Sequence, residues 1–98
     1  MYKSVILPLA KEDIREAAKW YNKRQNGLGK RFTAEVREKV HFIRQNPKAS
    51  NIRYTSVRTA VLNVFPFMVH FTIDEKHETI IISAVLHTSR NHELCKNR

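Results

Sequence analysis

Apolar and polar residues alternate along two segments in the C-terminal half of this chain. The first segment sets one group of side chains against another: Phe65, Phe67, Val69, Phe71 and Ile73 against Pro66, Met68, His70 and Thr72. The second segment, residues 79–87, repeats the period and places four residues on one side: Ile80, Ile82, Ala84 and Leu86. Successive side chains of a strand point to opposite faces, so we predict two strands joined by a turn over residues 74–78. We expect one face of this sheet to pack on a core and the other to stay partly open.

Helical spacing replaces this alternation in the N-terminal half. Residues 10–25 form a predicted amphipathic helix, with an apolar side and a basic stripe at successive i,i+4 steps: Ile14, Ala17, Ala18 and Tyr21, and Lys11, Arg15, Lys19 and Lys23. Residues 29–45 form a second helix, whose apolar positions recur every three or four residues: Leu28, Phe32, Val36, Val40 and Ile43. Gly27 allows the turn between the helices, and Pro47 marks the end of the second one.

Two further strands complete the predicted order. Residues 2–7 are a short apolar run that Pro8 ends, and another strand is expected near residues 52–62. The order β-α-α-β-β-β predicts an α+β fold of two layers, in which a helical hairpin covers one face of an antiparallel or mixed sheet. We expect a single domain over residues 1–98, because no repeat or low-complexity linker divides the chain.

Charge and composition narrow the function classes. The chain carries 18 Lys and Arg against 9 Asp and Glu, a net charge of +9, which favours phosphate backbones or an acidic protein as partner. A basic surface that only aids solubility is the alternative. The single cysteine, Cys95, cannot form an internal disulfide, and no cofactor or metal motif is present. No segment approaches the ~20 apolar residues of a membrane span, so we expect a cytoplasmic protein without membrane contact.

Residues that carry a family resemblance run through nearly the whole chain. They are Asp13-Ile14, Trp20-Tyr21, Leu28-Gly29, Phe32, Val36, Ile43, Asn46-Pro47, Arg58, Phe65-Pro66-Phe67, Ile73-Asp74, and Ala84-Val85-Leu86-His87 with Arg90. In this order and spacing the chain resembles the RelE/ParE superfamily of bacterial toxins. The resemblance implies a type II toxin-antitoxin module, also described as a plasmid stabilisation system, in which a cognate antitoxin wraps a segment over the toxin. An uncovered sheet face is also compatible with an oligomer.

The resemblance implies one of two mechanisms of growth arrest. ParE-type members bind DNA gyrase, whereas RelE-type members cut mRNA on the ribosome with an acid, a base and phosphate-binding cations. RelE-type sequences commonly carry an arginine early in the strand that here begins Phe65-Pro66-Phe67-Met68, and this chain has none there. We therefore favour a ParE-like toxin. Ribosome-dependent mRNA cleavage is the alternative, and a basic interaction domain without toxicity is a third hypothesis.

Candidate site residues follow from these alternatives. If the chain is RelE-like, the catalytic candidates are His87, Arg90 and Arg58. His87, with an ordinary pKa of ~6.5, suits general acid or base chemistry, or else a structural hydrogen bond at a strand end on the open face. Arg58 suits a phosphate clamp or a structural ion pair, and Arg90 a partner contact. Candidate contacts with a partner or nucleic acid are Lys48, Arg53, Tyr54, Met68, His70 and His92. Packing suffices to explain Trp20 and Tyr21.

Overall fold

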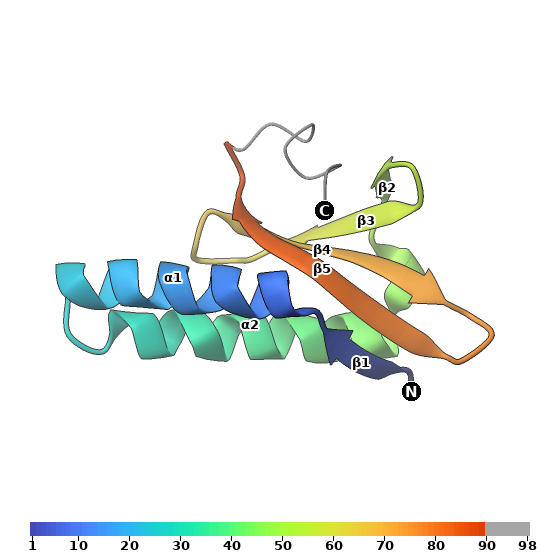
Figure 1. The fold of residues 1–98 in the computed structure, drawn as a ribbon, viewed down its shortest axis with the longest axis horizontal. Coiled ribbons are helices and arrows are strands. Elements are labelled where there is room, and N and C mark those ends of the chain that lie inside the picture. The colour runs from blue at the N-terminus through green and yellow to red at the C-terminus, as the bar shows by residue number, and fades with distance from the viewer. Residues whose placement is uncertain (90–98) are drawn as a thin grey trace.

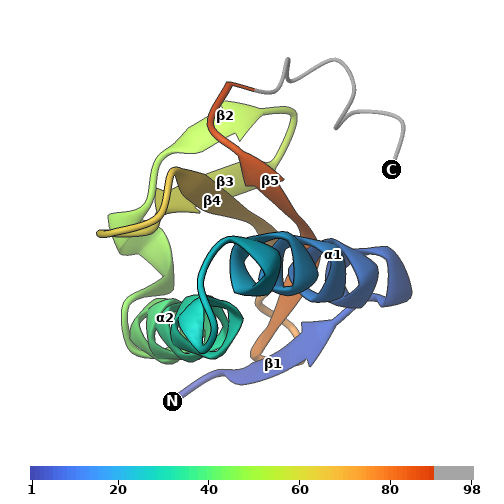
Figure 2. The same ribbon diagram turned by 90° about the vertical axis from the view of Figure 1, so that its left-hand side faces the viewer.

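The computed structural model describes residues 1–89 and places two helices on one face of a five-stranded sheet (Figure 1, Figure 2). The helices are α1 (Pro8–Arg24) and α2 (Leu28–Gln45), and the short 3₁₀ helix η1 (Pro47–Ala49) follows them. The strands are β1 (Lys3–Ile6), β2 (Ile52–Tyr54), β3 (Val57–Val61), β4 (Phe67–Asp74) and β5 (Thr79–His87). The predicted α+β fold, a mixed sheet covered on one face by a helical hairpin, is confirmed.

The sheet has the strand order β1-β5-β4-β3-β2, so the first strand of the chain lies beside the last. β1 pairs in parallel with β5, from Lys3 opposite Thr79 to Ile6 opposite Ile82, and the other pairs are antiparallel. The parallel pair ends with a hydrogen bond from the Leu7 N–H to the Ile82 carbonyl at 2.9 Å. The C-terminal half of β5 therefore extends beyond β1, along the side of α1.

The main core lies between the helices and the sheet. Phe32 of α2 packs edge-on against Phe65 and Phe67, with ring centroids 5.3 and 5.0 Å away. Tyr21 of α1 joins these rings, with its centroid 4.8 Å from that of Phe65. Full burial of an aromatic or branched aliphatic side chain contributes about 1.5–3 kcal/mol, so this aromatic group anchors both helices to β4.

Two glycines shape the helical hairpin in different ways. Gly27 has a φ of 90°, a left-handed conformation, and its N–H donates to the Asn22 side-chain oxygen at 2.9 Å. Gly29 lies at a close contact between the helices, and a Cβ atom there would meet the Ala18 carbonyl oxygen at 2.2 Å. The first glycine therefore permits the turn and the second permits the close packing of α1 and α2.

A β-bulge in β5 changes which of its side chains share a face. His70 of β4 pairs with Ala84, but Phe71 pairs with Ile82, so Ser83 is an extra residue on β5. Ile80 and Ile82 pack in the main core as predicted, whereas Ala84 and Leu86 lie in a second cluster with Tyr54. The prediction that all four share a face is wrong, because an extra residue reverses the alternation beyond it.

The predicted single strand over residues 52–62 is wrong as well. The chain forms two short strands there, β2 and β3, which pair with each other in antiparallel orientation. Thr55 between them has a φ of 45°, which places this turn residue in the left-handed region. Neither glycine nor proline marks this turn, so residue composition offers little signal for it. Within residues 1–89, no helix is long and apolar enough to cross a membrane.

Candidate functional site

His87 lies at the end of β5, opposite Phe67 of β4. Its ring packs edge-on against Phe67 with centroids 5.4 Å apart, and its Nδ1 accepts from the Ser89 N–H at 3.1 Å and from the Ser89 hydroxyl at 2.8 Å. The prediction that His87 lies on the open face is wrong, because the bulge turns this side chain toward the face that the helices cover.

Arg58 lies far along the sheet from His87. It pairs with Phe71 on β4, four residues beyond Phe67, which corresponds to roughly 13 Å along a strand. Its guanidinium donates to the Ser50 carbonyl at 2.6 Å and so holds the segment that enters β2. The structure therefore does not bring His87 and Arg58 together as an acid-base and phosphate-binding pair. Arg90 and His92 lie outside the described residues.

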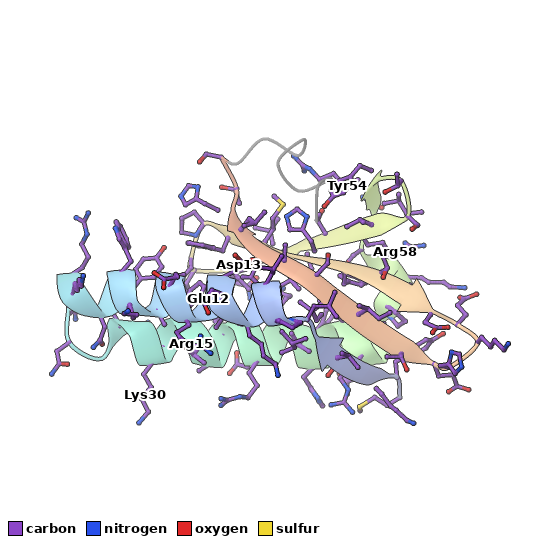
Figure 3. The ribbon with its side chains drawn as sticks, in the orientation of Figure 1. Glu12, Asp13, Arg15, Lys30, Tyr54 and Arg58 are labelled. Carbon is purple, nitrogen blue, oxygen red and sulfur yellow. The ribbon has the colours of Figure 1, made fainter. Side chains whose placement is uncertain are left out.

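Tyr54, Met68 and His70 are buried on the sheet face that lies opposite the helices. The Tyr54 hydroxyl and His70 Nδ1 are 3.1 Å apart, and His70 is 2% exposed. The predictions that Met68 and His70 lie on the surface are therefore wrong. They pair with Leu86 and Ala84, which form a second apolar cluster with Tyr54 on the sheet face that we expected to be open. Figure 3 shows Tyr54 and Arg58 at the β2–β3 end of the sheet, away from Asp13 on α1.

Lys48 and Arg53 remain on the surface. The Lys48 ammonium lies 2.7 Å from the Glu75 carboxylate, and this hydrogen-bonded pair raises the pKa of Lys48 and lowers the pKa of Glu75. Arg53 is exposed on β2. Both predicted contact residues are accessible to a partner, although the charge of Lys48 is already paired.

A groove of about 650 Å³ lies between α1 and the C-terminal half of β5. Its lining includes Asp13, Glu16, Trp20, Pro66, Phe67 and His87. Asp13 fixes the inner wall, because its carboxylate accepts the Val85 N–H at 3.1 Å beyond the end of β1. Trp20 is 52% exposed, so packing accounts for only part of its surface. Our sequence analysis missed this groove, although Asp13, Glu16 and Trp20 are spaced by three and four residues on one side of a predicted helix.

A second, more open groove follows the outer side of the helical hairpin. Four basic residues line it: Lys11, Arg15, Lys19 and Lys30. Arg15 forms an exposed ion pair with Glu12 at 2.6 Å, whereas the three lysines form no ion pair within residues 1–89. Figure 3 shows Arg15 on α1 and Lys30 on the neighbouring α2. This groove presents part of the positive charge that the composition indicated.

The comparison with known families decides the classification. A family model described as the ParE toxin of the type II toxin-antitoxin system, parDE, matches residues 5–92. The chain belongs to the ParE toxin family. No curated protein sequence matches this ParE-family chain significantly. Within residues 1–89 there is also no group of three or more His, Cys, Asp or Glu residues that could hold a metal ion.

Solved structures share the fold of this ParE-family toxin. A chain of the chromosomal ParDE toxin-antitoxin system from P. aeruginosa matches with a TM-score of 0.77 at 18% identity, over 89% of this chain and 96% of that one. A chain of the intact E. coli RelBE toxin-antitoxin complex gives 0.70 at 13% identity, over 92% and 100%. The isolated E. coli RelE toxin gives 0.69 at 12% identity, over 99% and 95%. ParE-type and RelE-type proteins thus share this architecture, so the fold alone does not select a mechanism.

Proposed function

We propose that this ParE-family toxin arrests growth by binding DNA gyrase and that a cognate antitoxin neutralises it. The family match over residues 5–92 carries the proposal. The geometry supports binding rather than cleavage: His87 packs against Phe67, and Arg58 holds the Ser50 carbonyl. The β4 residues opposite them, Phe67 and Phe71, are four residues apart. An inhibitor that acts by binding needs no assembled acid-base pair.

The groove on the outer side of the helical hairpin, lined by Lys11, Arg15, Lys19 and Lys30, is the surface that we assign to binding of the antitoxin. Lys11, Lys19 and Lys30 provide positive charge around a surface to which Ile14 and Ala18 also contribute. Such a surface suits an amphipathic segment whose polar side is acidic. The similarity to chains of ParDE and RelBE toxin-antitoxin systems supports an antitoxin as that partner.

The deciding experiment separates the two targets. The toxin is induced in growing bacteria, mRNA 5′ ends are mapped, and the purified protein is added to a gyrase supercoiling assay. We expect growth arrest with intact messages and inhibited supercoiling. His87→Ala should retain the arrest, because the proposed mechanism has no proton transfer at this imidazole. New mRNA ends within translated codons, lost in His87→Ala, would replace the proposal with ribosome-dependent cleavage, and normal growth would point to a domain without toxicity.

A charge-reversal pair tests the antitoxin surface. Lys19→Glu combined with Lys30→Glu should weaken binding of the co-encoded antitoxin about tenfold or more, because like charges then face its acidic side. Lys76→Glu, in the exposed β4–β5 turn, changes charge away from the groove and serves as the control. The double variant changes the net charge by −4 and the control by −2, so a loss of binding free energy about half as large in the control would mean that net charge, rather than this groove, controls the affinity.

A further inference from the structure

Two carboxylates, those of Asp13 and Glu16, line the groove between α1 and β5 in a chain whose net charge is +9. Glu16 is exposed and forms no ion pair within residues 1–89. Asp13 lies deeper, where its carboxylate accepts the Val85 N–H. The exposed Glu16 carboxylate makes this groove poorly suited to the acidic partner expected at the helical hairpin and favours a ligand of positive charge.

Trp20 adds a second feature that suits a cation. This residue is the single tryptophan of the chain, and it lies one helical turn after Glu16 on the groove side of α1. The Arg24 guanidinium lies 4.2 Å from the centroid of the Trp20 ring, so one arginine already stacks on the indole. Arg24 does not line the groove, and an indole has two faces that can attract a cation.

We propose that this groove binds an arginine side chain from a protein partner. The guanidinium would stack on the groove side of Trp20 and pair with the Glu16 carboxylate, while Pro66 and Phe67 contact the methylene groups of the side chain. Arginine fits better than lysine, because its planar guanidinium can stack and bind a carboxylate with two hydrogen bonds. This site does not depend on gyrase being the target, and it differs from the basic groove assigned to the antitoxin's acidic segment.

Fluorescence of the single tryptophan gives a direct assay on the full chain. The probes are the peptide acetyl-Gly-Leu-Arg-Leu-Gly-amide and three relatives with citrulline, lysine or glutamate at the central position. We expect saturable binding of the arginine peptide, about three- to tenfold tighter than that of the neutral citrulline peptide, as for a charge pair in a partly exposed site. Free arginine should bind more weakly than the peptide, because the flanking apolar residues also contact the groove.

Two matched variants locate the site. Glu16→Gln should remove the preference for arginine over citrulline, whereas Glu12→Gln, one turn earlier and paired with Arg15, should keep it. Trp20→Ala should weaken arginine-peptide binding when measured by calorimetry. Trp20 is half exposed, so its removal should leave the far-UV circular dichroism spectrum unchanged. Equal affinity for the arginine and glutamate peptides, equal effects of the two Gln variants, or free arginine binding as tightly as the peptide would overturn the proposal. None of these readouts requires growth arrest, so they can fail independently of the proposed function.

Discussion

Replacement of Gly29 by alanine should destabilise the fold through a clash between the two helices. A Cβ atom at Gly29 would lie 2.2 Å from the Ala18 carbonyl oxygen and 3.2 Å from the Asn22 Cβ. Carbon and oxygen atoms normally approach no closer than about 3.3 Å, so α1 and α2 must separate by about 1 Å at this point. The obstructing oxygen belongs to the backbone, and a side-chain rotation cannot move it.

Two opposing effects set the size of the change. Overpacking of this kind costs about 3 kcal/mol, at the upper end of the usual range because a backbone must move. Alanine regains about 1 kcal/mol of helix propensity over glycine. We therefore expect Gly29→Ala to lower the free energy of unfolding by about 2 kcal/mol, which corresponds to roughly 10 °C in melting temperature for a domain of this size.

Urea denaturation followed by circular dichroism measures this change in the free energy of unfolding. Two control variants separate the cost of the clash from the effects of helix propensity and backbone conformation. Ala34→Gly, on the exposed side of α2, gives the propensity difference within the same helix without any clash. Gly27→Ala has no atom within 4 Å of its new Cβ, so it measures only the cost of a φ of 90°, about 1–2 kcal/mol. A Gly29→Ala protein about 1 kcal/mol more stable than the original would refute the close-packing argument, because helix propensity alone would then explain the site.

Three smaller effects follow from polar contacts. Glu35→Ala should lower the free energy of unfolding in urea by about 1–2 kcal/mol, because the carboxylate accepts hydrogen bonds from two consecutive backbone N–H groups of the β3–β4 loop. An unchanged free energy of unfolding would show that water replaces the carboxylate equally well. A double-mutant cycle on Lys48 and Glu75 should give a small coupling that declines with added salt, since both side chains are more than half exposed. The His77 side chain lowers the pKa of Asp74 below its ordinary 3.8. The ionised Asp74 therefore stabilises the fold above pH 3.8, and this stabilisation is lost as the pH falls through the lowered pKa. Asp74→Asn should make the free energy of unfolding depend less on pH in the acid range, and an unchanged dependence would contradict the stabilising role of Asp74.

The sequence by itself determined both helices, the strands β1, β4 and β5, and the fold class. Apolar residues recur every three or four positions in both helices and every second position in β4, and these two periods fix which faces enter a core. With one strand before the helices and a meander after them, few packings bury all of these faces. The positive charge and the family resemblance also depend on residues that can be read directly along the chain.

Only the tertiary structure decided which candidate residues lie together. The extra residue Ser83 pairs with no residue of β4. The residues around it continue the strand pattern and do not predict a bulge, yet the bulge moves Leu86 and His87 to faces opposite to those predicted. His70 alternates like an outward residue, but Tyr54, from another strand, meets it in a buried hydrogen bond. Asp13 reaches Val85 only because β1 ends early and leaves that part of β5 beside α1. Each of these contacts joins segments far apart in the chain, so the short-range pattern of apolar residues that predicts helices and strands does not predict them.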